Sequence, residues 1–138
     1  MKKRKKRDRS YHPRFLISLC LFLMGCNETD FQQGKALYDI HCANCHMDDG
    51  TGLRGNIPPL AHADYLIQHT QQLPCIIRYG IQDTITVNGI TYNTPMAGIP
   101  SLTDIQITNI INYIHHAWGN EMGIVSAPQV RQQLKDCQ

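Results

Sequence analysis

The sequence predicts a small, mainly α-helical domain of three to five helices with one short β-hairpin. Two capping-box patterns, starting at Asp30 and Thr103, each precede apolar residues at helical spacing. Asn88-Gly89 lies between two β-branched runs, the strongest short-range signal for a hairpin. Without residues 1–25, which carry a targeting pattern, 113 residues remain, and this length fits one domain.

The N-terminal segment has the pattern of a secretory signal. Eight of the 13 Lys and Arg residues lie between positions 2 and 14, and an apolar run over 15–24 is too short to span a bilayer. Leu23-Met24-Gly25-Cys26 resembles the lipobox of bacterial lipoproteins, in which the cysteine is diacylated. We expect a signal peptide over 1–25 and a lipidated tether over 26–30. The protein would be anchored in the cell envelope and face the periplasm, on the inner or the outer membrane. An uncleaved anchor or an ordinary cleavage site is the alternative.

The positive charge belongs to that segment. From Cys26 onward, five Lys and Arg stand against ten Asp and Glu, a net charge of −5. This surface gives no basis for binding nucleic acid and suits a protein partner with a basic docking patch.

The first helix is expected to start at Asp30, with Gln33 as its capping partner, and to lead into Cys42-Ala43-Asn44-Cys45-His46. Cys-x-x-Cys-His is the attachment signature of a c-type haem, in which two thiols bond one porphyrin and the adjacent imidazole binds the iron. A structural zinc site would need more ligands, and a thioredoxin-like motif a βαβ context. A plain disulfide would leave His46 unexplained. One covalent haem c is therefore predicted, with His46 as proximal ligand.

The central elements follow from turn and breaker residues. Residues 48–60 are predicted to be a loop around the proximal side of the haem. A helical stretch from about Asp64 to Tyr79 should be broken near Pro74 and ended by Gly80. The hairpin comes next, and then the loop Asn93–Pro100, restrained by two prolines.

Met96, in that restrained loop, is the candidate for the sixth iron ligand. Met47 adjoins the proximal ligand and cannot reach the opposite face, while Met122 lies beyond the last helix. A methionine that only fills a gap in the core is the alternative. The competing histidines lack such a loop, and most of them are expected to be surface or capping residues: His41, His62, His69, His115 and His116.

The last helix has the clearest signals. Thr103 is its predicted N-cap with Gln106 as capping partner, Leu102 and Ile107 occupy the staple positions, and Gly119 is the expected stop. The predicted buried stripe consists of Ile107, Ile110, Ile111 and Ile114. The C-terminal tail, residues 120–138, should add a short helix near Pro128.

Cys75 and Cys137 are the two cysteines left once haem, lipid and signal peptide have taken the others. In an oxidising compartment we expect a disulfide between them, which would tie the tail to the domain. Two separate buried thiols are the alternative.

From Phe31 to Gly119 the chain resembles a class I, monohaem cytochrome c. The resemblance is carried by Gly34-x-x-x-Tyr38, Cys42-x-x-Cys45-His46, Pro58-Pro59-Leu60, Met96, and a last helix with Tyr113 and Trp118. It implies that the first and last helices cross, with Gly34 and Tyr38 against the Tyr113 face. It further implies that the Pro58 carbonyl accepts a hydrogen bond from His46 and that Leu60 packs on the porphyrin.

The resemblance also implies an electron carrier and not an enzyme. The stretch from Ile85 to Met96 is similar to cytochrome modules found beside periplasmic dehydrogenases and copper nitrite reductases. A subunit that transfers electrons within a dehydrogenase, reductase or oxidase complex is therefore one alternative. A haem sensor or peroxidase with a labile sixth ligand is the other.

Overall fold

The computed structural model describes residues 31–137, so the predicted signal peptide, Cys26, the tether and Asp30 lie outside the described residues. The helices and strands are α2 (Gln32–His41), α3 (Ala43–His46), α4 (Asp64–Gln68), α5 (Leu73–Tyr79), β1 (Gly80–Ile81), β2 (Ile85–Val87), β3 (Ile90–Tyr92), β4 (Met96–Ala97), α6 (Asp104–His116) and α7 (Ala127–Lys135). The described part is mainly helical, as the sequence predicts, but it has six helices where three to five were expected and a second antiparallel strand pair, β1 with β4, besides the predicted hairpin.

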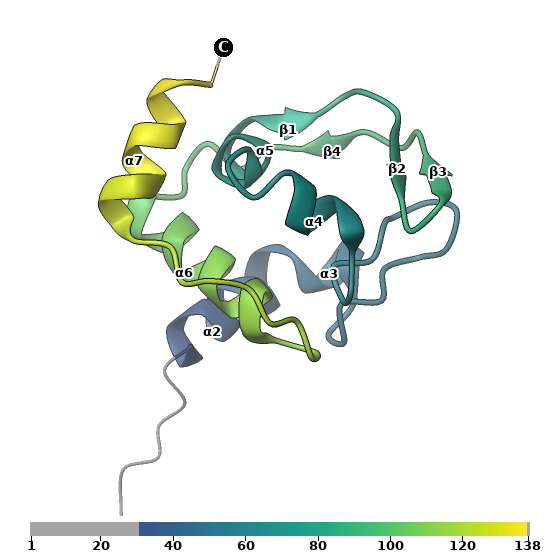
Figure 1. The fold of residues 1–138 in the computed structure, drawn as a ribbon, viewed down its shortest axis with the longest axis horizontal. Helices are drawn as coiled ribbons and strands as arrows, with labels where there is room; N and C mark the ends of the chain where they lie inside the picture. The colour runs from purple at the N-terminus through teal and green to yellow at the C-terminus, as the bar shows by residue number, and fades with distance from the viewer. Residues whose placement is uncertain (1–30, 138) are drawn as a thin grey trace, which may run out of the picture.

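The crossing of α2 and α6 is the centre of the fold (Figure 1). Gly34 makes the crossing possible, because a Cβ there would overlap the Asn109 carbonyl oxygen and lie 2.7 Å from Cβ of Tyr113. Tyr38, one turn further along α2, is fully buried beside this contact. The predicted isoleucine stripe of α6 is buried, with exposed fractions between 0% and 6%: Ile107, Ile110, Ile111 and Ile114.

The start of the first helix differs from the prediction. The residue that precedes α2 is Phe31, and no side chain caps the helix there. Gln33, the expected capping partner, instead accepts a hydrogen bond from Asn109 Nδ2 at 3.2 Å. The ring of Phe31 stacks on that of His116 with centroids 4.5 Å apart. Contacts with α6 therefore hold this end of the helix.

The second helical stretch is broken near Pro74, as predicted, over residues 69–72. α4 ends at Gln68, and Pro74 is the second residue of α5. Proline is tolerated in the first turn of a helix because its missing N–H would have no partner there. The expected break near Pro74 is therefore confirmed, and Pro74 itself lies in the first turn of the helix that follows the break. Gly80, with φ +83°, ends α5 as predicted.

The predicted hairpin is present, and its turn also caps a helix. β2 and β3 pair antiparallel, and both Asn88 and Gly89 have positive φ, as a two-residue primed turn requires. Asn88 Oδ1 accepts the backbone N–H of Asp64 at 3.0 Å, and the Asn88 N–H donates to Asp64 Oδ1 at 2.8 Å. The first of these bonds satisfies the Asp64 N–H at the start of α4, where Ala63 provides no side-chain cap.

The last helix begins as predicted and ends two residues early. Thr103 and Gln106 form the complete capping box. The helix ends at His116, before Trp118, because Asn120 folds back and donates its side-chain amide to the Ile114 carbonyl at 2.8 Å. The same amide group donates to the Leu60 carbonyl at 3.0 Å, which ties the end of α6 to the loop that follows the haem motif.

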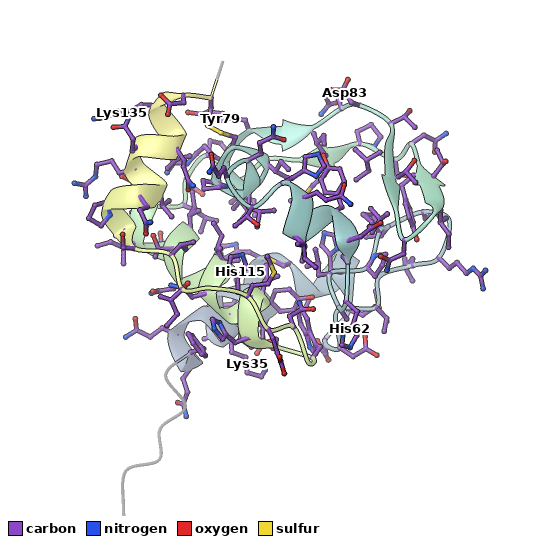
Figure 2. The ribbon with its side chains drawn as sticks, in the orientation of Figure 1. Lys35, His62, Tyr79, Asp83, His115 and Lys135 are labelled. Carbon is purple, nitrogen blue, oxygen red and sulfur yellow. A yellow bond between two sulfur atoms is a disulfide. The ribbon has the colours of Figure 1, made fainter. Side chains whose placement is uncertain are left out.

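The tail forms α7, which packs against α5 and α6 (Figure 1). Val130 is its fully buried contact. A disulfide joins Cys75 of α5 to Cys137, with Cα atoms 5.6 Å apart, and appears as the yellow bond near the end of α7 in Figure 2. Asp104 accepts hydrogen bonds from Arg78 and Arg131, which links the same two helices to α6. Within residues 31–137, no helix is long and apolar enough to cross a membrane.

Candidate haem-binding site

The Cys-x-x-Cys-His motif forms one helical turn, α3, directly after α2. The His46 N–H donates to the Cys42 carbonyl at 2.9 Å, so both cysteines and the histidine follow one another around this turn. Cys42 and Cys45 are free thiols, the first half-buried and the second exposed. His46 is buried, with 8% of its surface exposed. The turn thus presents the sulfur of Cys42 at its start, and the sulfur of Cys45 and the imidazole of His46 at its end.

The acidity of Cys42 differs from that of a redox-active dithiol. Burial, with a smaller contribution from Cys45, raises the pKa of the Cys42 thiol to about 11. Disulfide oxidoreductases of the Cys-x-x-Cys type have a lowered thiol pKa, since the thiolate is their nucleophile. Cys42 therefore lacks the lowered thiol pKa that marks the nucleophile of these oxidoreductases.

The imidazole of His46 is held by a residue of the next loop. Nδ1 of His46 lies 3.0 Å from the carbonyl oxygen of Pro58. A carbonyl only accepts hydrogen bonds, so Nδ1 carries the proton and Nε2 keeps a free lone pair. Burial lowers the pKa of His46, which favours the neutral ring that a metal requires. The structure thereby presents Nε2 of His46 as a ligand atom.

The loop between His46 and Pro58 depends on glycines. Gly50 and Gly52 have φ of +68° and +63°, values that favour glycine. A Cβ on Gly52 would lie 2.6 Å from the Pro58 carbonyl oxygen, so only glycine allows this close approach. The Gly50 carbonyl accepts the N–H groups of Leu60 and Ala61 at 2.7 and 3.0 Å. Leu60 is half-buried and packs against the core next to this loop.

Met96 comes from a different part of the fold. It lies on β4, paired with Ile81 of β1, and its side chain is half-buried. In Figure 1, β4 and α3 lie on opposite sides of α4. The sequence predicts a proline-restrained loop here, whereas the structure adds a strand pair. The backbones of Gly80 and Gly98 pack so closely around it that a Cβ on Gly80 would overlap the Met96 carbonyl oxygen.

The other histidines have separate positions. His41, His62 and His116 are exposed. His69 stacks on Tyr65, and its Nδ1 lies 3.0 Å from the Tyr65 carbonyl oxygen. His115 is fully buried, which the sequence reasoning missed. Its Nδ1 lies 2.7 Å from the Gly123 carbonyl oxygen, so it contacts the segment after α6 (Figure 2).

Two aromatic residues contact the haem motif in a way the sequence reasoning also missed. The Tyr38 hydroxyl donates to the Met47 carbonyl at 2.6 Å, and the Trp118 indole N–H donates to the Asp48 carbonyl at 2.9 Å. Tyr38 was expected at the helix crossing and Trp118 on the last helix, but no local pattern indicates which carbonyls their polar atoms reach.

The donor set fits a haem c. The protein provides two adjacent free thiols for the porphyrin vinyl groups and a neutral, oriented imidazole for the iron. A structural zinc site would need further ligands. Among residues 31–137, no group of three or more His, Cys, Asp or Glu could hold a metal ion by itself. The motif therefore fits a prosthetic group that brings its own equatorial ligands.

Comparisons with known proteins agree with this chemistry. The family described as Cytochrome c matches residues 31–118. Cytochrome c-552 of Thermus thermophilus is 37% identical over 91 residues, which are 63% of this chain and 69% of that protein. A second cytochrome c-552 of this species has the same identity, and the match covers 61% of it.

Two larger proteins match through part of their length. The fructose dehydrogenase cytochrome subunit of Gluconobacter japonicus is 34% identical over 108 residues, which are 75% of this chain and 22% of the subunit. The cytochrome c subunit of a quinone alcohol dehydrogenase from Gluconobacter oxydans is 32% identical over 101 residues, which are 71% of this chain and 21% of the subunit. The chain thus spans about a fifth of these subunits. On its motif, its fold and these matches, the chain belongs to the cytochrome c family, whose members carry a covalently bound haem c and transfer electrons without being catalytic themselves.

Proposed function

We propose that this chain is a lipid-anchored, periplasmic electron carrier whose haem iron is bound by His46 and Met96. The observation that carries the proposal is the hydrogen bond between Nδ1 of His46 and the Pro58 carbonyl, which prepares Nε2 for the iron. The haem supplies one-electron chemistry between the ferric and ferrous states. The residues of this chain hold it, shield it from water and occupy its axial positions.

The support for Met96 is the way its backbone is held. β4 pairs with β1, and the closely packed Gly80 and Gly98 leave this segment little freedom. A side chain on a fixed backbone binds a metal without a further loss of backbone entropy. The half-buried thioether of Met96 is therefore a suitable axial ligand, and it would favour the reduced iron, because histidine and methionine ligation raises the potential.

A redox titration of the haem-loaded protein tests this assignment. Met96→Ala removes the thioether, so we expect the reduction potential to fall. Met122→Ala is the matched control, because Met122 is also half-buried but lies in the segment after α6. An unchanged potential in Met96→Ala, or an equal fall in both variants, would contradict Met96 as the ligand.

The envelope location is supported by the sequence alone. Cys26 ends a lipobox-like tetrapeptide, and the lysines and arginines that precede it form the basic part of a signal. Two or three acyl chains would give stable anchoring where one chain would be marginal. We expect Cys26→Ala to release the cytochrome from the membrane fraction and to abolish incorporation of labelled fatty acid. A Cys26→Ala variant that stays in the membrane fraction and still incorporates labelled fatty acid would contradict lipidation at Cys26.

The partner is proposed to present a basic docking patch, since the residues from Cys26 onward carry a net charge of −5. The similarity to cytochrome subunits of dehydrogenases supports a second candidate function, an electron-transfer subunit in such a complex. Purification from the native membrane distinguishes these two candidate functions. A subunit remains with a dehydrogenase through a salt wash, whereas a free carrier leaves its partner as ionic strength rises.

A further inference from the structure

Three aromatic rings form a cluster where α2 crosses the end of α6. The ring centroids of Tyr38 and Tyr113 are 5.3 Å apart, those of Tyr38 and Trp118 5.1 Å, and those of Tyr113 and Trp118 5.5 Å. All three pairs are tilted or edge-to-face, the arrangement that aromatic quadrupoles favour. The cluster is therefore a closely packed unit, and Tyr38 at its centre is fully buried.

Two polar atoms of this cluster reach the turn that follows His46. The Tyr38 hydroxyl binds the carbonyl of Met47 at 2.6 Å, and the Trp118 indole binds the carbonyl of the next residue, Asp48, at 2.9 Å. Met47 has φ +64°, a conformation uncommon for a residue with a side chain. Two hydrogen bonds to consecutive carbonyls hold the backbone in this conformation.

Trp118 also fixes the turn by contact. A Cβ on Gly50 would lie 2.6 Å from Cε3 of Trp118, so the indole lies directly against the Gly50 backbone. The Gly50 carbonyl accepts the N–H of Leu60, two residues after Pro58. The cluster thus contacts both supports of His46. Its hydrogen bonds reach residues 47 and 48, which directly follow His46. Its contact with Gly50 reaches the loop that carries the Pro58 carbonyl, the hydrogen-bond partner of the His46 ring.

We propose that Tyr38 and Trp118 are positioning residues that set the orientation of the His46 imidazole plane. Their hydrogen bonds fix the turn directly after His46, and the indole fixes the loop that carries its partner Pro58. This inference rests on the proposed function, because it takes His46 as the iron ligand. A purely structural cluster would stabilise the helix crossing without affecting the ligand.

The matched set of variants is Tyr38→Phe, Trp118→Phe and Tyr113→Phe. Tyr38→Phe removes only the hydroxyl that binds Met47 and keeps the ring. Tyr113→Phe removes the same group from the same cluster, and the Tyr113 hydroxyl makes no hydrogen bond among the side chains and backbone of residues 31–137. Trp118→Phe removes the indole N–H and leaves an aromatic ring.

The readout is the set of haem methyl resonances in the proton NMR spectrum of the ferric protein, together with its reduction potential. The hyperfine shifts of these methyl groups depend on the direction of the axial imidazole plane, which helix stability alone does not change. We expect Tyr38→Phe and Trp118→Phe to alter the order or spread of the shifts and to move the potential. Tyr113→Phe should leave both at the wild-type values.

Two results would overturn the inference. Wild-type methyl shifts in Tyr38→Phe and Trp118→Phe would show that the cluster is only structural, even if both variants unfold more easily. Equal changes in Tyr113→Phe would show that any disturbance of the crossing has this effect. If only one of Tyr38→Phe and Trp118→Phe folds, the test is the comparison of its haem methyl shifts with those of Tyr113→Phe. A wild-type protein without covalent haem would instead contradict the proposed function.

Discussion

The carbonyl oxygen of Pro58 lies 3.0 Å from Nδ1 of His46, a residue twelve positions earlier in the chain. This contact determines which ring nitrogen carries the proton and therefore which one can bind iron. It requires the loop from 47 to 58 to fold back on itself, which Gly50 and Gly52 allow with their positive φ. The ligand atom is thus prepared by backbone conformation as much as by the motif itself.

Gly52→Ala tests the dependence of this contact on the loop. The new Cβ would lie 2.5 Å from the Ile57 carbonyl oxygen and 2.6 Å from that of Pro58, so the backbone that carries the Pro58 carbonyl must shift. We expect a lower unfolding temperature and altered haem methyl shifts. Gly55→Ala is the control, because Gly55 has φ +82° but no atom within 4 Å of its added Cβ. It should show only the cost of the left-handed conformation, about 1 kcal/mol. Equal effects in both variants would contradict the role of Gly52.

The disulfide between Cys75 and Cys137 closes a loop with a sequence separation of 62. Loop entropy predicts a contribution of roughly 4 kcal/mol to the free energy of unfolding, less if the unfolded chain retains structure. We expect Cys137→Ser to lower the midpoint of denaturant unfolding and to lower the hydrogen-exchange protection of α7 first. Protection in α7 equal to that of the wild type would show that Val130 and Arg131 hold this helix without the disulfide.

His115 predicts a pH dependence of stability. Burial lowers its pKa below the ordinary value of 6.5, and Nε2 has no hydrogen-bond partner in the described residues. A histidine with a lowered folded pKa binds protons better when unfolded. Its contribution to stability is therefore present above pH 6.5 and is lost as the pH falls towards the folded pKa. The pKa of His46 is lowered too, but in the proposed haem complex this side chain binds the iron and does not titrate freely.

Unfolding of His115→Gln and His116→Gln, measured between pH 7.5 and about pH 5, checks this prediction. The loss of stability on acidification should be smaller in His115→Gln than in the wild type. His116→Gln should retain it, since His116 is the exposed neighbour on the same helix. The same pH profile in all three proteins would mean that His115 is not the group responsible.

The sequence predicted the elements whose signals are local. The capping box at Thr103 and the Asn88-Gly89 turn each contain their own partners within a few residues, and both are present. The break near Pro74 is likewise present, over residues 69–72. The first helix begins one residue later than predicted, and Gln33, the expected capping partner, accepts a hydrogen bond from Asn109 on α6, 76 positions away. A local pattern does not contain such a distant partner.

The prediction of the site rests on a local signal of the same kind. Cys42, Cys45 and His46 lie within five positions, and their spacing predicts a c-type haem. The buried His115 and the hydrogen bonds of Tyr38 and Trp118 to the turn after His46 depend on segments that meet only in the folded protein. No pattern of neighbouring residues contains that information.

The central claim is that His46 and Met96 together leave the iron with no open position. The direct test is the absorption spectrum of the haem-loaded protein in its ferric and ferrous states, with and without carbon monoxide. The ferrous spectrum of the wild type should not change with carbon monoxide, whereas that of Met96→Ala should. Ready binding of carbon monoxide by the wild type would contradict the claim and favour a sensor or a peroxidase over an electron carrier.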